Sequence, residues 1–357
     1  MKLGLFLMPA HPPERSLKDG ADFDLRSIRA ADRLGYTECW IGEHFTVPWE
    51  PCPAPDLLIA QALLQTEQIR LGAGAHLLPY HHPAELAHRI AYLDHLSGGR
   101  LNLGVGAGGI LTDFQLFGVD GIGGENRTMM WEALDMILRL WSTSEPFEIK
   151  GEHWNVAQPA SGLGGLFTPH ITPLQRPHPP IAIAALSPNS ASLRICGERG
   201  FSPMSLNLNS QYIQGHWAQV EQGAAAAGRE ADRADWRVVR DVFVAETDEI
   251  ALDKALNGGM GRMFEEYFIP QLANFGYLDL LKHDPSVRDD EITAEYLVHT
   301  NALVGSVDTV VSKLRKLQDE MGGFGTLLQL GYDYVEDPDP WYESMELLAR
   351  DVMPALR

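Results

Sequence analysis

The sequence predicts a (β/α)8 TIM barrel built as one domain over residues 1–357. Short apolar segments alternate with segments of helical periodicity along the chain, and eight such pairs follow one another. The apolar segments carry few polar residues on either side, which is typical of parallel strands buried on both faces. This alternation gives either an open, doubly wound sheet or a closed barrel, and eight units favour the closed barrel.

Each predicted strand is a short apolar run followed by a helical segment. The helix at 22–35 is expected to end at Gly35, a common stop signal, and the helix at 55–66 begins on a proline, which suits the first helical turn. Insertions are expected at about 142–179, after the fourth strand, and at 247–304, after the seventh. The predicted strands are 3–8, 37–42, 69–75, 100–106, 180–186, 201–206, 236–245 and 325–331. The remaining predicted helices are 83–97, 126–141, 188–199, 211–227, 306–318 and 342–353.

Composition narrows the class of protein. The net charge of −20 argues against a nucleic-acid partner. Three cysteines, Cys39, Cys52 and Cys196, form no disulfide framework and suggest reduced thiols. The apolar run at 3–8 is shorter than the core of a signal peptide, and no apolar stretch is long enough to span a membrane. We therefore expect a cytoplasmic protein that does not enter a membrane.

Gly104, Gly106 and Gly109 have the spacing of the G-x-G-x-x-G dinucleotide fingerprint. That motif follows the first strand of its unit and leads directly into a helix, whereas three predicted strands precede these glycines and a long loop follows them. A Rossmann site is therefore not favoured. The glycines are placed instead at the end of the fourth strand, where they let the barrel close tightly or let a flat ligand lie against the backbone. These two roles are compatible.

Catalytic groups of such barrels lie at the carboxyl ends of the strands. His44 follows the second strand and is the best candidate for acid–base chemistry, because imidazole titrates near neutral pH. The alternative is a structural histidine bonded to a loop carbonyl. Glu43 would point to the opposite side if it still belongs to the strand. Apolar residues expected at the same rim suit a hydrophobic organic ligand: Phe6, Met8, Phe45, Trp49 and Leu78.

A group of histidines follows the third strand. His76, His81, His82 and His88 contain no HExxH pattern, and prolines interrupt the helical register between them. We therefore predict no metal site and interpret them as loop and surface histidines.

A second polar group follows the fifth strand, where Ser187, Asn189 and Ser190 surround the start of a helix. Hydroxyls and free backbone amides at a helix start can bind an anion. The same residue types also favour simple capping of the helix. Both interpretations stay open.

The segment HLLPYHHPAELAHRIAYLDHLSGGRLNLGVGAGG at 76–109, preceded by WIGEHF, resembles the bacterial luciferase-like flavin monooxygenases. Within that family the likeness is greatest to the branch that holds limonene and diketocamphane monooxygenases. VGSVDTVVSKL and the terminal DVMPAL extend the resemblance over essentially the whole chain. The set of motifs is specific, although no single motif is.

The resemblance implies a barrel that binds reduced FMN at its carboxyl rim. The flavin would react with O2 to a C4a-hydroperoxide, which transfers one oxygen atom to a small hydrophobic substrate such as a terpene or a cyclic ketone. Epoxidation, Baeyer–Villiger insertion and hydroxylation all remain open. A separate NAD(P)H:flavin reductase would supply the reduced flavin, and a homodimer is implied.

The resemblance also implies roles for individual residues. His44 matches the catalytic histidine of the luciferases, with a role in managing protons around the flavin peroxide. Gly74–Ala75 matches a non-proline cis peptide that lies against the flavin ring. The other residues expected to bind the cofactor are Glu43, His76, Gly106, Ala107, Ser187, Asn189 and Ser190.

The phosphate site departs from the family pattern. Luciferases carry an arginine after the fourth strand, and the matching residue here is Ala107. The phosphate would then depend on helix amides, on the hydroxyls of Ser187 and Ser190, or on a distant base such as Arg262. We therefore expect FMN to bind weakly and to exchange.

Other interpretations remain beside the leading one. The insertion at 247–304 resembles the mobile lid of the luciferases, which would exclude water from the flavin; the alternative is a helix pair that packs a dimer. The same barrel also hosts deazaflavin-dependent dehydrogenases and reductases, and the absence of Arg or Lys at the ends of the fourth and fifth strands counts mildly against that polyanionic cofactor. A non-catalytic flavin-binding protein is the third class.

Overall fold

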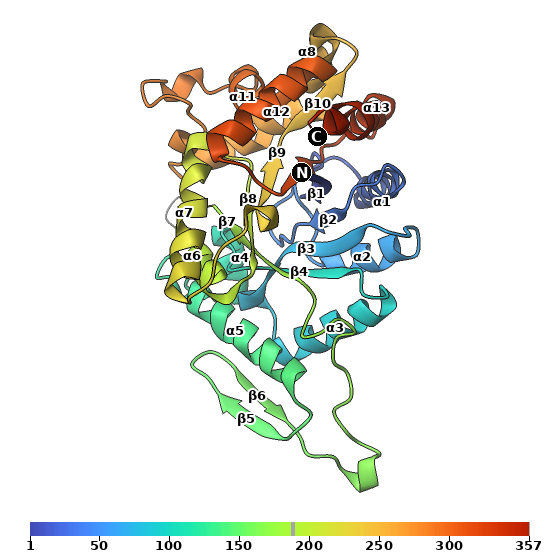
Figure 1. The fold of residues 1–357 in the computed structure, drawn as a ribbon, viewed down its shortest axis with the longest axis vertical. Helices are drawn as coiled ribbons and strands as arrows, with labels where there is room; N and C mark the ends of the chain where they lie inside the picture. Colours follow the sequence, from blue (N-terminus) through green and yellow to red (C-terminus); the bar gives the residue numbers. More distant parts are fainter. Residues whose placement is uncertain (187–189, 357) are drawn as a thin grey trace.

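Eight parallel strands close into a barrel in the computed structural model, which describes residues 1–186 and 190–356 (Figure 1). The strands follow the order β1–β12–β9–β8–β7–β4–β3–β2 around the ring, which confirms the predicted closed barrel. They are β1 (Lys2–Leu7), β2 (Glu38–Ile41), β3 (Arg70–Leu77), β4 (Leu101–Gly106), β7 (Ile181–Ala185), β8 (Ser202–Ser205), β9 (Arg237–Arg240) and β12 (Thr326–Leu330). The single-domain organisation over 1–357 stays a prediction.

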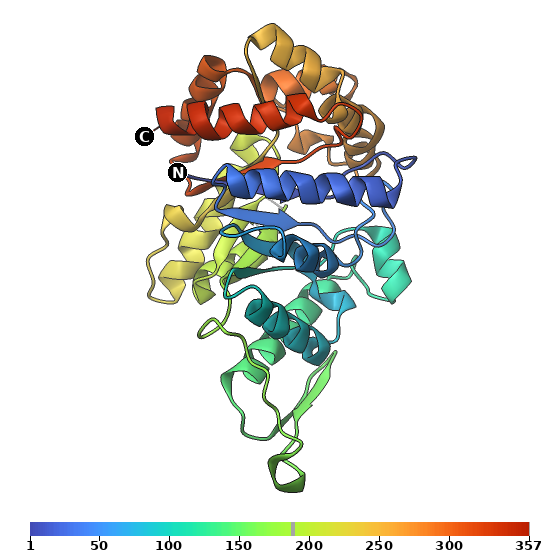
Figure 2. The ribbon, with the colours of Figure 1, turned by 90° about the vertical axis from the view of Figure 1, so that its right-hand side faces the viewer.

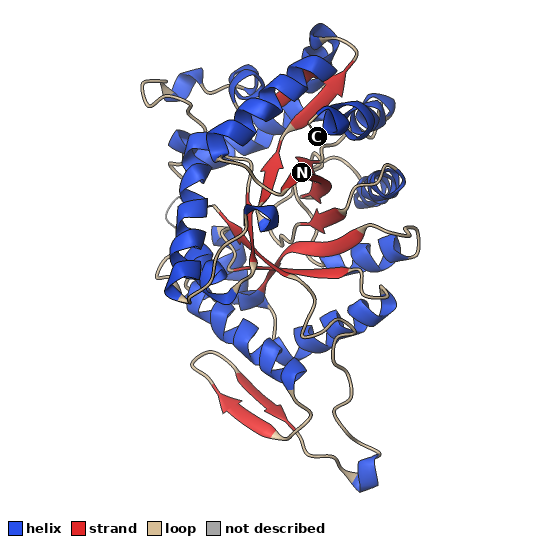
Figure 3. Cartoon of the chain, in the orientation of Figure 1, coloured by secondary structure: helices blue, strands red, loops and turns tan. Residues whose placement is uncertain are grey.

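Helices cover the outside of the strands (Figure 3). In Figure 2, α1 (Leu17–Arg33, blue) lies beside α13 (Asp339–Leu347, red), and the rings of Phe23 and Tyr342 meet at a centroid distance of 6.1 Å. The helices that follow or flank the barrel strands are α1 (Leu17–Arg33), α2 (Pro55–Leu63), α3 (Pro83–Leu96), α5 (Glu125–Ser142), α6 (Ala191–Arg199), α7 (Ser210–Ala226), α12 (Val307–Met321) and α13 (Asp339–Leu347).

The first helix begins five residues earlier than predicted. Ser16 caps it, since its hydroxyl accepts a hydrogen bond from the backbone N–H of Asp19 at 3.1 Å. A capping serine satisfies one of the free N–H groups of the first turn, so the helix can start there before its apolar face begins.

The predicted strand 236–245 is wrong as a single element. It is divided at Asp241 into barrel strand β9 and a second strand, β10 (Val242–Ala245). β10 leaves the barrel and pairs in parallel with β11 (Leu303–Ser306). The buried carboxylate of Asp241 is held by Asn207 and Tyr332, which follow β8 and β12, so the carboxyl end of β9 is fixed at this residue.

Both predicted insertions are present. The first extends away from the barrel as an antiparallel hairpin (Figure 1), and the second contains several short helices and one π-helical turn. A helix also lies at 111–117, where only a loop was predicted. These segments are α4 (Leu111–Phe117), β5 (Phe147–Lys150), β6 (Asn155–Gln158), η2 (Leu163–Gly165), α8 (Asp248–Leu256), α9 (Gly259–Met263), the π-helical η4 (Phe264–Phe268), α10 (Ile269–Asn274), η5 (Leu278–Leu280), η6 (Asp289–Glu291) and α11 (Ala294–Thr300).

The remaining short elements are η1 (Leu78–Tyr80), η3 (Arg233–Asp235), the π-helical η7 (Leu348–Val352) and α14 (Met353–Ala355). The core is a single cluster in which Trp40, Trp236 and Trp341 are among the largest fully buried side chains. Among the described residues, no helix combines the length and the apolar character that crossing a bilayer requires.

The contact between β3 and β4 requires glycine. A Cβ atom on Gly104 would lie 2.1 Å from the carbonyl oxygen of Ala73 and 3.1 Å from the ring of Trp40. Because this oxygen belongs to the backbone of the neighbouring strand, it cannot move aside as a flexible side chain could. A Cβ atom on Gly109 would have no other atom within 4 Å. The G-x-G-x-x-G spacing therefore includes one glycine that packing requires, Gly104, and one that it does not, Gly109. The close strand contact supports the tight-closure role for Gly104.

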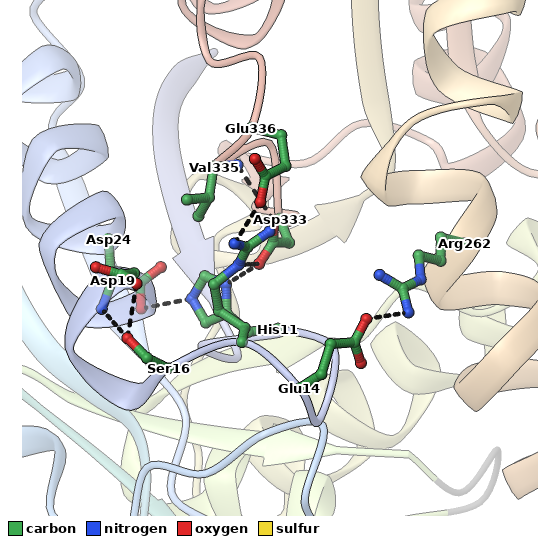
Figure 4. A network of polar contacts seen from close by, with 10 residues as sticks. His11, Glu14, Ser16, Asp19, Asp24, Arg262, Asp333, Val335 and Glu336 are labelled. Carbon is green, nitrogen blue, oxygen red and sulfur yellow. Dashed lines mark hydrogen bonds and ion pairs between the residues drawn. The ribbon is translucent and has the colours of Figure 1, made fainter.

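A short N-terminal segment, residues 9–16, joins α1 to the loop after β12 (Figure 4). His11 is buried and lies between two carboxylates: its Nδ1 is 2.7 Å from Asp333 and its Nε2 is 3.2 Å from Asp24. Arg15 adds ion pairs to Asp333 and to Glu336. Burial opposes a charge on His11, but the two carboxylates outweigh it and raise its pKa to about 9.

Replacing Gly104 by alanine is expected to lower the free energy of unfolding by at least about 2 kcal/mol, because a methyl group must be forced against backbone. The matched control, Gly109→Ala, meets open space and is expected to stay within about 0.5 kcal/mol of the parent. Urea unfolding followed by circular dichroism measures both. Equal stabilities for the two variants would remove the close strand contact as a constraint.

The charge on His11 predicts a pH-dependent stability. Its folded pKa, about 9, lies above the ordinary value of 6.5, so the stabilisation is fully present below pH 6.5 and is lost as pH rises towards 9. The loss should be on the order of 2–3 kcal/mol. Urea unfolding at pH values from 6 to 9 measures it. In His11→Gln this fall should disappear, and an unchanged slope in the variant would contradict the assignment.

Candidate active site

His44 lies at the carboxyl rim of the barrel, in the loop between β2 and α2. Its backbone N–H donates to the carbonyl oxygen of Cys52 at 3.1 Å, which fixes the loop. The imidazole lies between two buried carboxylates: Nε2 is 3.3 Å from Oε2 of Glu50, and Nδ1 is 3.9 Å from Oδ2 of Asp113. The ring therefore faces acidic groups rather than the loop carbonyl of the structural alternative.

These carboxylates change the proton affinity of His44. Burial alone would lower its pKa, but the charge of Glu50, and then the nearby Asp113, outweigh burial and leave the pKa above its ordinary value. Burial raises the pKa of Glu50, against the opposing effect of His44. Because both acids favour the imidazolium form, His44 is arranged to hold a proton near neutral pH.

Asp113 belongs to the first turn of α4 and ties that helix to the loop that carries His44. Its carboxylate accepts hydrogen bonds from the backbone N–H groups of Phe45, at 3.4 Å, and Thr46, at 2.8 Å, and from the Thr46 hydroxyl. Burial would raise the pKa of Asp113, but these bonds and the neighbouring His44 outweigh it and lower the pKa. The carboxylate therefore stays charged beside the imidazole.

Glu43 has its own set of partners, separate from those of His44. One carboxylate oxygen accepts the backbone N–H of Leu77 at 2.6 Å, and both lie within 3.0 Å of Nε2 of His81. Glu43, His76 and His81 bring their polar atoms within 4.8 Å of one another, but both Glu43 oxygens are already engaged in these bonds. We assign this cluster no metal role, and the absence of a metal site stays a prediction.

The peptide bond between Gly74 and Ala75 is cis, as the resemblance implied. It lies inside β3, whose pairing with β4 shifts register between Ala73 and His76. A Cβ atom on Gly74 would lie 2.9 Å from the side chains of both Phe6 and Trp40, so the backbone there rests directly on the core.

His76 is the next side chain along this strand, and it is buried. Its Nδ1 atom has no hydrogen-bond partner, and burial lowers its pKa to about 4, so the ring is neutral near pH 7. A buried ring atom without a partner at the barrel rim is suited to a polar group of a bound ligand.

The expected phosphate-binding residues are only partly described. Ser190 caps α6, because its hydroxyl accepts from the backbone N–H of Leu193 at 3.3 Å, whereas Ser187 and Asn189 lie outside the described residues. Gly106 ends β4, and the carbonyl oxygen of Ala107 accepts from Nδ2 of Asn126 at 3.0 Å.

The distant base Arg262 is already paired with acidic side chains. Its guanidinium lies 2.6 Å from Glu14 (Figure 4) and 2.8 Å from Glu266. Both bonds raise the pKa of Arg262. A phosphate would have to compete with these two carboxylates for the guanidinium.

Aromatic side chains gather around Phe45, the residue after His44. Phe45 meets Tyr80 edge-on at 5.6 Å and Phe117 at 4.7 Å, and Tyr80 and Phe117 are stacked at 4.5 Å. Trp49 stacks on Tyr267 of the second insertion at 5.9 Å. Met8 is half-buried, whereas Phe6 and Leu78 are almost wholly buried, so their contact with a substrate stays a prediction.

Several rim residues could not be found by sequence reasoning. Asp113 and Phe117 lie in α4, in a stretch interpreted as loop, and Asp241 lay within the over-long strand prediction. Glu50 follows the second strand at a distance, and Tyr267 belongs to the insertion. The one available signal was LTDFQLFG at 111–118, which has an acidic first turn and a terminal glycine.

The fold and this rim match a known family along the chain. Residues 1–322 match the model of the luciferase-like monooxygenases. The chain is 35% identical to 3,6-diketocamphane 1,6-monooxygenase of Pseudomonas putida, covering 100% of this chain and 98% of the relative. It is 32% identical to limonene 1,2-monooxygenase of Rhodococcus erythropolis, covering 98% and 85%.

A solved structure shows the same likeness. The oxygenating constituent of 3,6-diketocamphane monooxygenase of Pseudomonas putida, a type II Baeyer–Villiger monooxygenase solved in complex with FMN, superposes with a TM-score of 0.94 at 35% identity, covering 100% of this chain and 99% of that one. The chain belongs to the luciferase-like monooxygenase family. The resemblance recognised in the sequence is thereby confirmed.

Proposed function

We propose that this protein is a monooxygenase that binds reduced FMN at the barrel rim and uses O2 to oxygenate a small hydrophobic molecule, such as a terpene or a cyclic ketone. The observation that carries the proposal is the full-length likeness, at a TM-score of 0.94, to an oxygenating constituent solved with FMN. Bound reduced FMN supplies the electrons and the site of O2 activation. The protein supplies binding, orientation, water exclusion and proton control.

The residues at the rim fit a flavin. The backbone at Gly74–Ala75 carries no side chain larger than a methyl group, so a flat ring can lie against it. Nδ1 of the neutral His76 has no partner and can bond to a polar ring atom without adding charge. With Ala107 in place of an arginine, the phosphate depends on the start of α6 and Ser190, which supports weak, exchangeable binding.

His44 has a proton role in this proposal. The carboxylates of Glu50 and Asp113 favour its charged form, and Nδ1 is buried without a hydrogen-bond partner. His44 can therefore donate a proton to, or hold one beside, a reacting oxygen atom at the rim.

The remaining assignments follow from the same likeness. Phe45, Tyr80 and Phe117 offer an apolar aromatic wall beside His44 for a hydrophobic substrate. The relative solved with FMN is an oxygenating constituent, which supports a separate NAD(P)H:flavin reductase as partner here. A cytoplasmic homodimer completes the proposal.

An isotope experiment tests the reaction class. The protein is mixed anaerobically with photoreduced FMN and a bicyclic terpene ketone or limonene, and 18O2 is then admitted. One labelled oxygen atom in the product, seen by mass spectrometry, is expected. An alcohol oxidised without O2 when F420 replaces FMN, with no labelled product from FMN, would favour the deazaflavin-dependent alternative instead.

Substituting His44→Gln is expected to reduce product formed per reduced FMN by at least about 100-fold, with the lost product replaced by hydrogen peroxide, because proton control at the rim is lost. Affinity for reduced FMN should change little, since the substitution removes no phosphate contact. The matched control is His299→Gln on the exposed face of α11, which should keep the parental yield. A parental yield in His44→Gln would remove His44 from the mechanism.

A further inference from the structure

The buried carboxylate of Glu50 is shared between the barrel rim and the second insertion. Its Oε2 atom is 3.3 Å from Nε2 of His44 and accepts a hydrogen bond from the hydroxyl of Tyr267 at 3.1 Å. Glu50 is only 5% exposed, so water does little to satisfy its charge. The same oxygen atom thus serves a rim histidine and a side chain 217 residues away.

Tyr267 is itself held from several sides. It lies in the π-helical turn η4, and its hydroxyl oxygen accepts from Nε2 of Gln271 at 2.8 Å, so the hydroxyl proton is directed to Glu50. Its ring stacks on Trp49 with an angle of 14° between the planes. The guanidinium of Arg262, which also belongs to the insertion, lies 5.8 Å from the centroid of the Trp49 ring. The hydroxyl therefore has a defined position.

The carboxylate of Glu50 influences which nitrogen of the neutral His44 ring carries the hydrogen atom. A neutral imidazole has one N–H donor and one acceptor, and a carboxylate beside one nitrogen keeps the hydrogen there. Nε2 is 3.3 Å from Glu50, whereas Nδ1 is 3.9 Å from Asp113, so the nearer carboxylate, Glu50, favours the hydrogen on Nε2 when the ring is neutral. Nδ1 is buried and has no hydrogen-bond partner.

We propose that Glu50 is a positioning residue that fixes the Nε2–H form of the neutral His44 ring against the competing carboxylate of Asp113, and that Tyr267 holds Glu50 in place from the insertion. This deepens the proposed function and rests on it. The contacts from Tyr267 to Glu50 and from Glu50 to His44 thereby couple the position of the insertion on the rim to the tautomer of His44.

Acidic groups from several elements act on the charge of His44. From the loops packed against it, the ring faces Glu50 and Asp113, and the charge of Glu43 acts from the neighbouring residue. From the insertion, Tyr267 is the titratable side chain that reaches Glu50, and its hydrogen bond opposes the effect of burial on the pKa of Glu50. Arg262 is paired with acidic side chains.

Histidine ring resonances of the ligand-free protein test the proposal without any flavin. Nitrogen-15 NMR of histidine-labelled protein gives both the pKa and the tautomer of His44, whose signals are assigned by their loss in His44→Gln. In Glu50→Gln the charge is lost but an acceptor remains, so the pKa should fall by about one unit while the Nε2–H tautomer persists. In Glu50→Leu both the charge and the acceptor are lost. The pKa should therefore fall, and the hydrogen of the neutral ring should move to Nδ1, beside Asp113.

Tyrosine variants test the contribution of the insertion. Tyr267→Phe should lower the His44 pKa by less than the Glu50 variants do. Glu50 keeps its carboxyl group but, without the tyrosine donor, competes more strongly with His44 for the proton. The matched control is Tyr334→Phe, another tyrosine stacked on a tryptophan, at 5.8 Å from Trp341, and it should leave His44 unchanged.

Parental His44 titration and tautomer in folded Glu50→Leu would overturn the proposal. If the Glu50 variants do not fold, Tyr267→Phe decides alone, and an unchanged titration there overturns it. Because no flavin is present, shifted His44 signals in a protein that fails to oxygenate any substrate would reject the proposed function and retain the positioning role.

Discussion

Closure of the eight-stranded ring is the constraint on which the rest of the structure depends. One tight point is the contact of β3 with β4, where Gly104 leaves room for the backbone of Ala73 and the ring of Trp40. Closure brings the carboxyl ends of all eight strands to one rim. Side chains far apart in the chain, such as His44, Asp113 and Tyr332, therefore share that rim.

The rim concentrates carboxyl groups in places that water scarcely reaches. Glu50 and Asp113 lie beside His44, and Asp241 lies with Asn207 and Tyr332 after other strands. Burying a carboxylate is costly unless donors surround it, and each of these acids has hydrogen-bond donors or a histidine. His44 therefore lies among acidic and aromatic side chains, and the acids raise its pKa. Because Glu50 and Asp113 lie beside different ring nitrogens, they restrict the orientation of the ring.

Much of the fold could be predicted because it depends on local pattern. Alternating apolar and amphipathic segments predicted all eight barrel strands, and His44 could be placed because it directly follows one of them. The strand at 236–245 was wrong because the valines of β9 and the apolar residues of β10 follow one another closely in the sequence. The intervening Asp241 is stabilised by residues that follow two other strands. The cis peptide at Gly74–Ala75 was reached only through family resemblance, since no local pattern signals it. Glu50 and Tyr267 could not be paired in advance, because their contact is set by how the insertion folds back onto the rim.

The order of strands around the ring has a consequence for synthesis. β12 pairs with both β1 and β9, and it is the last of the eight barrel strands along the chain, so it is the strand that closes the ring. A nascent chain that has not yet released residues 326–330 can form at most an open sheet, with β1 and β9 exposed as unpaired edges. Such edges can recruit other strands, so the chain should be most prone to association in the period before β12 is made.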